Sequence, residues 1–169
     1  MQSFHAGLEG VKKLLMDLNP HKASGPDHVP TRLLKEYAED IAPALTLVFN
    51  ASLKQGEVPS DWKKANVSPV FKKGDRSDPA NYRPISLTSV CSKVLEHIIH
   101  SQVMRHLDHH EILSDNQHGF RKRRSTESQL ILTLNDLSSA LDEWDQIDAI
   151  LLDFSKAFDK VPHKRLLAK

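Results

Sequence analysis

The chain has 169 residues, of which 39% are hydrophobic and 27% are charged, and its 23 basic and 22 acidic residues leave a formal net charge of +1. This length allows one ordinary domain with a real core, and the balanced charge gives no global field of the kind that marks a nucleic-acid-binding protein. The single cysteine, Cys91, excludes an internal disulfide and fits a reducing compartment, no apolar run approaches the ~20 residues of a membrane span, and the first residues, MQSFHAGLEG, lack the pattern of a secretion signal.

A helix is predicted at the N-terminus. Apolar residues recur at helical spacing from Phe4 to Leu18, and Asn19-Pro20 ends that pattern. The following stretch, residues 21–30, contains Gly25-Pro26 among small and polar residues. This composition predicts an irregular, exposed loop.

A second helical region is predicted from about Thr31 to Gln55. Pro43 is expected in the first turn of its later half, with Asp40 as the N-cap, because proline is tolerated where no backbone N–H is needed. Gly56 is expected to stop the helix.

Two short strands are predicted on either side of a basic, turn-rich loop at residues 72–81. The segments 66–71 and 82–87 have the composition of extended chain, and together they suggest a hairpin. Pro69 and Pro84 confine both strands to edge or irregular positions.

Two further helices are predicted, one from about Ser89 to His110 and one that Ser125 can cap. Basic loop sequence separates them at residues 115–125. The core face of the second helix is expected to consist of Leu130, Leu134, Leu137, Leu141 and Trp144.

The apolar residues Ile150, Leu151 and Leu152 are followed by a carboxylate, Asp153. The segment 150–154 therefore predicts a buried strand that leaves the core at an acidic residue. Such a carboxylate is well placed to hold a metal ion, but a carboxylate that only caps the following turn explains it equally well. The capping interpretation is stronger for Asp159, which precedes the helix expected to open at Val161-Pro162. The predicted elements together give an α+β fold that is mostly helical.

Gly25, Gly74 and Gly119 each lie beside basic or amide groups. Exposed backbone N–H groups next to Lys or Arg suit phosphate binding, whereas each cluster taken alone also fits a solvated surface. The run Arg121–Arg124 also matches a nuclear import patch.

Five histidines lie between His97 and His110 at spacings that fit a helix face. Zinc binding is disfavoured because Cys91 is the only thiol and no metalloprotease pattern is present.

Five segments, in their order and approximate spacing, resemble the reverse transcriptases of non-LTR, LINE-like retrotransposons of the jockey and CR1 type. They cover the chain from about Lys22 to Lys169. The segments are KASGPD (22–27), VP (58–59) with WK (62–63) leading to VFKKG (70–74), NYRPISL (81–87) followed by Lys93 and Glu96, QHGFR (117–121) with ST (125–126), and DFSKAFDKV (153–161).

The resemblance implies a right-hand polymerase fold: mostly helical fingers plus the first palm strand, truncated before the catalytic hairpin. The implied domains are an N-terminal helix over 1–20, a fingers region over 21–145 and the incomplete start of the palm over 146–169.

The resemblance also implies a metal site. Asp153 matches the first catalytic aspartate, and the carbonyl of Phe154 would be a further ligand of magnesium. Nucleotidyl transfer uses two metal ions about 3.5–4 Å apart and needs more than one carboxylate. The family supplies the others from a later paired-aspartate hairpin, so the chain alone is expected to be inactive.

The implied nucleotide-binding residues form one set and the implied template-binding residues another. Phe158 matches the steric gate under the sugar, Ala157 would present its N–H to the triphosphate, and Arg83 matches the arginine that clamps it. The remaining nucleotide candidates are Lys73, or alternatively Lys72, with Gln117 and Gly119. The template candidates are Lys22, Gly25, Asp27, Phe120 and Arg121.

The implied partners are an RNA template, a DNA primer and a dNTP, with no membrane and an open oligomeric state. The parent element would act inside the cell, in nucleus and cytoplasm. Two alternatives stay open: a remnant that binds RNA or nucleotide without chemistry, and a relic without specific activity. A steep fall of RNA affinity with salt would favour the binding remnant.

Overall fold

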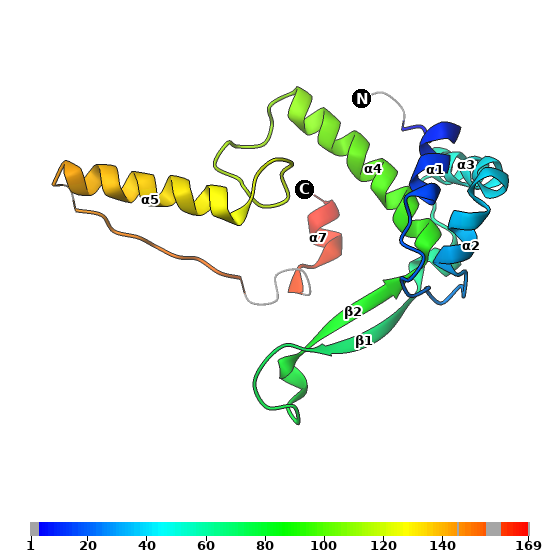
Figure 1. The fold of residues 1–169 in the computed structure, drawn as a ribbon, viewed down its shortest axis with the longest axis horizontal. Helices are drawn as coiled ribbons and strands as arrows, with labels where there is room; N and C mark the ends of the chain where they lie inside the picture. The colour runs from blue at the N-terminus through cyan, green and yellow to red at the C-terminus, as the bar shows by residue number, and fades with distance from the viewer. Residues whose placement is uncertain (1–3, 145, 155–159, 169) are drawn as a thin grey trace. The chain divides into compact units, whose positions relative to one another are not determined.

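The computed structural model describes residues 4–144, 146–154 and 160–168, and the chain divides into two compact units, residues 1–113 and residues 114–169 (Figure 1). The first unit contains the helices α1 (Leu8–Met16), α2 (Thr31–Glu36), α3 (Ala38–Gln55) and α4 (Val90–His109), and the strands β1 (Ala65–Phe71) and β2 (Tyr82–Thr88). Short 3₁₀ helices precede the strands, at Ser60–Lys63 and Pro79–Asn81. The second unit contains α5 (Thr126–Asp142) and α7 (His163–Leu167). No helix in the described ranges is both long and apolar enough to cross a membrane.

The helices of the first unit follow the sequence pattern with two corrections, at the starts of α1 and α3. The helix predicted from Phe4 is shorter, since α1 begins at Leu8. The N-cap of α3 is Tyr37 rather than Asp40, so the prediction that Pro43 lies in the first turn is wrong. The helix starts early because Ala38 and Ala42 are buried in the core, and this packing outweighs the hydrogen bond that proline cannot donate. Gly56 ends α3 as predicted, in the left-handed region at φ 68°.

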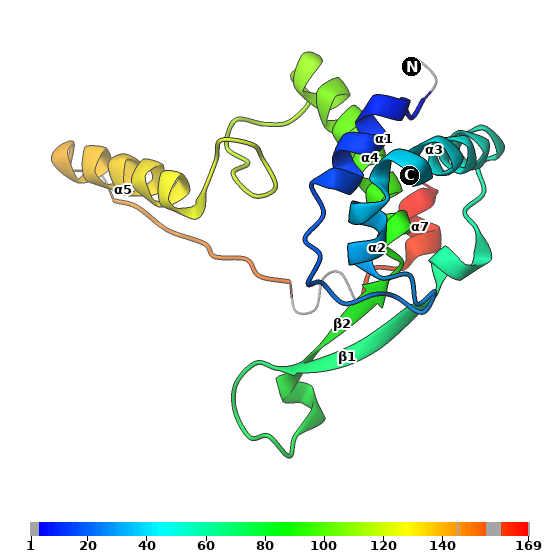
Figure 2. The ribbon, with the colours of Figure 1, turned by 45° about the vertical axis from the view of Figure 1, so that its right-hand side comes forward.

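The core of the first unit lies between α1, α2, α3 and the first half of α4 (Figure 2). Phe49 is fully buried and packs edge-on against Trp62, with 5.7 Å between the ring centroids. Apolar burial of this kind is the main favourable term in folding. The buried hydrophobic residues are Ala6, Val11, Leu15, Leu34, Ala38, Ala42, Leu45, Phe49, Val90, Cys91, Val94 and Leu95.

The predicted hairpin is confirmed as a two-stranded antiparallel sheet that extends away from the helices α1 to α3 (Figure 2). Pro69 pairs with Pro84 in its register. The Lys72 N–H donates to the Asn81 carbonyl at 2.8 Å, so alternation makes the proline pair a non-hydrogen-bonded one. The backbone nitrogens of both prolines therefore point away from the partner strand, so the hydrogen bonds between β1 and β2 are kept. Each outer edge of the sheet loses one N–H donor, which disfavours pairing with a further strand.

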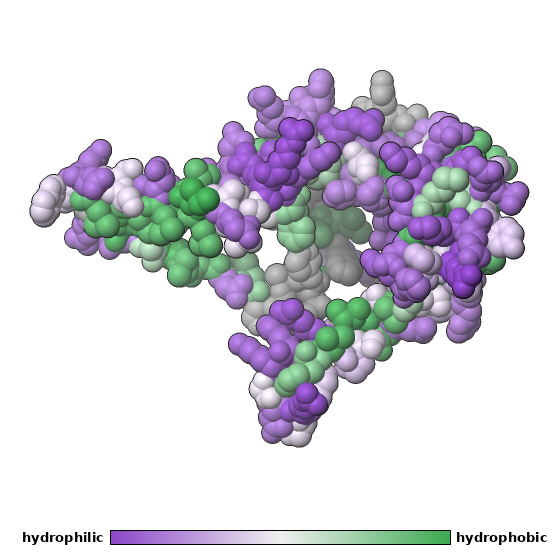
Figure 3. All heavy atoms as spheres, viewed as in Figure 1, coloured by the Kyte–Doolittle hydropathy of each residue, from purple (hydrophilic) through white to green (hydrophobic). Residues whose placement is uncertain are grey.

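The helix α5 is confirmed at its predicted start but not in its predicted packing. Ser125 accepts from the Ser128 N–H, and the Ser128 hydroxyl accepts from the Ser125 N–H, which completes a capping box. The expected core face does not lie in a core: Leu134 is 61% exposed and Trp144 is 96% exposed. Figure 3 shows hydrophobic residues over the surface of α5. The pattern correctly predicted a helix, but none of the described elements of its own unit covers that face.

The buried strand predicted at residues 150–154 is not formed. Residues 146–154 have no strand pairing, and Leu151 and Leu152 are 95% and 84% exposed. A strand needs a partner to satisfy its backbone groups and to bury its side chains, and the described residues of this unit form no other strand. The α+β description stands in a coarser form, as helices with one small antiparallel sheet.

Candidate nucleotide and template site

The hairpin carries its basic side chains in a fixed alternation. Arg83 is exposed and lies opposite Val70 in the register. Residues directly opposite each other in the two strands share a face of the sheet, and so do residues two apart in one strand. Lys72 is opposite Asn81, and Asn81 is two residues from Arg83, so Lys72 lies on the same face as Arg83. The two cations that sequence analysis associated with a triphosphate can therefore act from one side of the sheet. Lys73 is exposed in the bend that follows.

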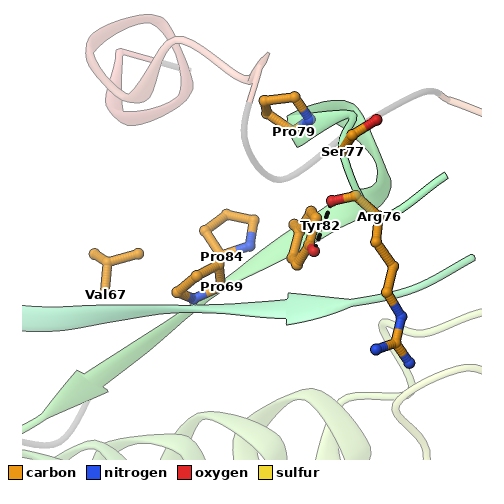
Figure 4. A pocket seen from close by; sticks show the side chains of 7 residues that line it. All are labelled: Val67, Pro69, Arg76, Ser77, Pro79, Tyr82 and Pro84. Carbon is orange, nitrogen blue, oxygen red and sulfur yellow. Dashed lines mark hydrogen bonds between the residues drawn. The ribbon is translucent and has the colours of Figure 1, made fainter.

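The other face of the hairpin is apolar and forms a groove of about 560 Å³ (Figure 4). Phe71 and Tyr82 pack edge-on at 5.5 Å between centroids, and the Arg76 guanidinium lies 5.2 Å from the centre of the Phe71 ring. The groove is lined by Val67, Pro69, Arg76, Ser77, Pro79, Tyr82 and Pro84. Sequence analysis did not detect it, because cross-strand pairing, rather than neighbours in sequence, brings its walls together.

The loop between the strands is held by its own polar groups. Gly74 adopts φ 93°, and a Cβ there would lie 2.7 Å from the Asn81 side chain. The Asn81 side chain donates to the Asp75 carbonyl at 2.9 Å. The Tyr82 hydroxyl donates to the Arg76 carbonyl at 2.8 Å (Figure 4). A hydrogen bond from the Ser77 N–H holds the pKa of Asp75 below its ordinary value. The tip of the hairpin is therefore preorganised.

The loop of residues 21–30 packs against the start of α4. Gly25 is buried rather than exposed, and a Cβ there would lie 2.5 Å from the Ser89 nitrogen and 2.6 Å from the Thr88 carbonyl carbon. The prediction of an exposed loop is therefore wrong at Gly25, and close backbone packing accounts for the glycine. Asp27 is half-buried and accepts from the Val29 N–H at 3.4 Å, whereas Lys22 is exposed.

Cys91 lies buried close to this loop. Burial, with the negative charge of Asp27 as a smaller contribution, raises the pKa of the Cys91 thiol to about 11. The thiol is therefore protonated at neutral pH and acts as a core side chain.

The segment 114–125 in the second unit is ordered by a polar network that sequence analysis missed. The Arg124 guanidinium donates to the Asp115 carboxylate at 2.7 Å and also to the Asp115 carbonyl. The His118 ring contacts the Ser128 hydroxyl at 2.8 Å. Arg121 donates to the Ser114 carbonyl at 3.0 Å. The QHGFR motif showed that this segment matters, but only the fold brings these partners together.

The candidates in this segment differ in exposure. Gln117 and Gly119 are exposed, and the Gln117 side chain donates to the Gly119 carbonyl at 3.2 Å. Phe120 is 86% exposed and adopts φ 59°. Arg121 is half-buried. Exposed ring and amide groups on a fixed backbone suit contact with bases and phosphates.

The candidate metal ligands lie in the extended segment before residue 155. Asp153 and Phe154 are both exposed. Carboxylate and carbonyl oxygens are the chemistry that Mg²⁺ prefers. Within the described ranges, no three His, Cys, Asp or Glu side chains are grouped to hold a metal ion. Ala157, Phe158 and Asp159 lie outside the described residues.

The model of the family described as reverse transcriptase (RNA-dependent DNA polymerase) matches residues 70–169. The chain is 32% identical over 163 residues to a probable RNA-directed DNA polymerase from transposon BS of Drosophila melanogaster, and equally to the RNA-directed DNA polymerase from mobile element jockey of the same species. Each match covers 96% of this chain and 18% of the relative. A Pol polyprotein from the type-1 retrotransposable element R2 of Popillia japonica is 27% identical over 114 residues, which cover 68% of this chain and 16% of that protein.

The resemblance to non-LTR retrotransposon enzymes that the five segments predicted is thus confirmed by independent matches. The chain spans less than a fifth of the length of these relatives. The reverse transcriptase family uses divalent metal ions and acts on an RNA template with nucleotide substrates. The matched region contains the second strand of the hairpin, the ordered segment 114–125 and Asp153. This chain belongs to the reverse transcriptase family.

Proposed function

We propose that this chain provides the fingers and the beginning of the palm of a non-LTR retrotransposon reverse transcriptase, whose whole activity is RNA-directed synthesis of DNA. The proposed roles divide as 1–20 for an N-terminal helix, 21–145 for the fingers and 146–169 for the start of the palm. The parent element would act in nucleus and cytoplasm. The family match over residues 70–169 supports this assignment.

The triphosphate of the incoming nucleotide would be held by the face of the hairpin that carries Arg83. A guanidinium donates bidentate, charge-assisted hydrogen bonds to phosphate oxygens, and a second cation strengthens the field. The register that puts Arg83 and Lys72 on one side of a preorganised hairpin carries this proposal. Lys72 is favoured over Lys73, because the hydrogen bond between Lys72 and Asn81 puts Lys72 on the same face of the sheet as Arg83. By the family resemblance, Gln117 and Gly119 would contact the nucleotide, and Ala157 and Phe158 would contact its triphosphate and sugar.

The template would contact the exposed groups of the segments 22–27 and 117–121. Phe120 can stack on a base, and Arg121 and Lys22 can approach phosphates. Gly25 and Asp27 would act through the shape of their loop, since Gly25 is buried against the start of α4.

Asp153 would supply one carboxylate, and the Phe154 carbonyl one oxygen, to magnesium in the complete enzyme. The ion would stabilise charge that develops on the reacting phosphate. The described residues do not complete that site. We therefore expect the purified chain to bind primed RNA without extending it. Magnesium-dependent extension that Asp153→Asn abolishes would contradict this expectation.

A binding remnant without chemistry is the second candidate function. The order of the hairpin loop and of the segment 114–125, which is built from polar and basic groups, favours it. RNA affinity of the chain that falls steeply with salt would support binding, because phosphate contacts release counterions.

The triphosphate assignment is tested by comparing Arg83→Gln with Arg76→Gln. Both variants remove one positive charge from the hairpin, but Arg76 lies over the Phe71 ring and lines the opposite groove. Loss of charge-assisted hydrogen bonds predicts about tenfold or more weaker binding of a dNTP with the Arg83 variant, measured by fluorescence titration. Little change is expected with the Arg76 variant. Equal losses in both would indicate a general charge effect and would contradict the assignment.

A further inference from the structure

His118 is the one buried side chain among the described residues of the second unit. It is 9% exposed, while the surrounding apolar residues, including Phe120, are open to solvent. A buried polar side chain needs hydrogen-bond partners, and both ring nitrogens of His118 have one. The segment 114–128 is therefore ordered around the hydrogen bonds of a buried histidine.

The hydrogen-bond partners of His118 assign its tautomer. Nε2 lies 3.3 Å from Nη1 of Arg124, and a guanidinium can only donate, so Nε2 must accept. Nδ1 lies 2.8 Å from the Ser128 hydroxyl. That hydroxyl donates its single proton to the Ser125 carbonyl at 2.9 Å, so it accepts from His118. Only a neutral imidazole with its proton on Nδ1 satisfies both contacts.

The ring of His118 thus contacts two neighbouring polar arrangements of the segment. On one side is the capping box that begins α5, and on the other is the ion pair between Arg124 and Asp115. Charged groups facing the ring are the Arg124 guanidinium and, through it, the Asp115 carboxylate.

The backbone between Asp115 and Arg124 is strained. Phe120 and Arg123 adopt φ 59° and 63°, the left-handed region that is unfavourable for a residue with a side chain. Such conformations persist where surrounding contacts hold them, and they gather at binding sites. Contacts of His118, Arg124 and Arg121 are among those that hold this stretch.

We propose that His118 is the positioning residue of the candidate template segment, acting as a neutral, Nδ1-protonated link between the first turn of α5 and the Arg124–Asp115 pair. It holds Gln117, Phe120 and Arg121 in the conformation that meets nucleic acid without itself touching it. The claim that this conformation meets nucleic acid rests on the proposed function, whereas the claim that His118 holds the conformation does not.

The first test is spectroscopic and uses the full chain with ¹⁵N-labelled histidine. Long-range ¹H–¹⁵N spectra are expected to show His118 with a protonated Nδ1 and a bare Nε2, the resonance being assigned by its loss in His118→Gln. A bare Nδ1 would overturn the proposed link, because it would require the Ser128 hydroxyl to turn away from the Ser125 carbonyl.

The second test compares His118→Ala with His118→Asn and with the control His100→Ala, which changes an exposed histidine of α4. The Asn amide can still donate to Ser128. In the Ala variant, the backbone chemical shifts of Phe120 and Arg123 are expected to move away from the values typical of positive φ. In the Asn variant, the shifts are expected to return part of the way. The second readout is affinity for a fluorescein-labelled RNA template annealed to a DNA primer. This affinity should fall about tenfold in His118→Ala, by less in His118→Asn, and not at all in His100→Ala.

The outcomes separate the two claims. Unchanged backbone shifts in His118→Ala would overturn the positioning role, and changed shifts with unchanged affinity would overturn its connection to nucleic acid. If the parent chain does not bind primed RNA, the proposed function fails, and the shifts alone still decide whether His118 positions the segment. If the Ala variant loses α5, measured as helical circular dichroism, the Asn variant decides the same question.

Discussion

The two units of the chain differ in what holds them together. Residues 4–113 contain helices that bury apolar side chains against one another, whereas residues 114–168 bury only His118 among the described positions. Both units contain amphipathic helices of similar length, α4 with 20 residues and α5 with 17. The apolar face of α4 is buried at Val90, Val94 and Leu95, while that of α5 is open. An amphipathic pattern therefore predicts a helix without supplying its partner.

The contrast has a functional consequence. The hairpin of the first unit is held by its own strand pairing and by the hydrogen bonds of its loop, so Arg83 lies on a paired backbone. The segment 114–125 depends on polar contacts that each contribute about 1 kcal/mol. Variants that remove core contacts should therefore affect the first unit far more than the second.

The largest expected effect comes from Phe49→Ala. Phe49 is fully buried and packs on Trp62, so its loss should lower the free energy of unfolding by about 3–5 kcal/mol. The matched control is Leu134→Ala on α5, where the side chain is 61% exposed and the expected change is within about 0.5 kcal/mol. Urea denaturation measures both. Similar losses would show that α5 is covered in solution.

The next effect in size is that of Gly25→Ala. The new methyl group would meet the backbone of Thr88 and Ser89 at 2.5–2.7 Å, and such overpacking costs about 1–3 kcal/mol. Gly10→Ala is the control, because open space surrounds that helical position and alanine should stabilise α1 by about 0.5–1 kcal/mol. Thermal unfolding should show opposite signs. A neutral Gly25→Ala would mean that the loop 21–30 does not pack on the start of α4.

A smaller effect is expected from Ser125→Ala, which removes the cap of α5. The helix should lose about 0.5–2 kcal/mol, and since no core holds it, the loss should appear as reduced helical circular dichroism. Ser139→Ala, at an exposed position inside the same helix, should keep or slightly raise helicity. Equal helicity in both variants would contradict the importance of the capping box.

The smallest effect concerns the ion pair between Lys12 and Glu39, 2.6 Å apart on the surface of the first unit. The hydrogen bond from Lys12 holds the pKa of Glu39 below its ordinary value of 4.5. A carboxyl whose pKa is depressed in the folded state stabilises above its unfolded pKa, and this contribution disappears as the pH falls below 4.5 through the folded value. The free energy of unfolding, measured from pH 7 downward, should decrease slightly more with falling pH in the parent than in Lys12→Met. Parallel profiles would show that the pair contributes nothing.

Much of the local structure could be read from the sequence. The stop at Gly56, the hairpin with its two prolines and the cap at Ser125 were all predicted, because each depends on the conformational preferences of a few neighbouring residues. The motifs also indicated the family, since they preserve chemistry at defined positions along the chain.

The errors share one physical cause. The start of α3, the burial of Gly25 and the missing strand at residues 150–154 depend on partners distant in sequence. A run of apolar residues predicts a strand only where another strand is present to pair with it.

What the sequence alone determined was the order of the helices and of the hairpin, the cap residues Gly56 and Ser125, and the membership of a polymerase family. Only the tertiary structure decided which cations share a face of the hairpin, why residue 25 is glycine and how His118 joins the Arg124–Asp115 pair to α5. Local propensity acts over a few residues, whereas burial, register and hydrogen-bond partnership are properties of chain segments that meet only after folding.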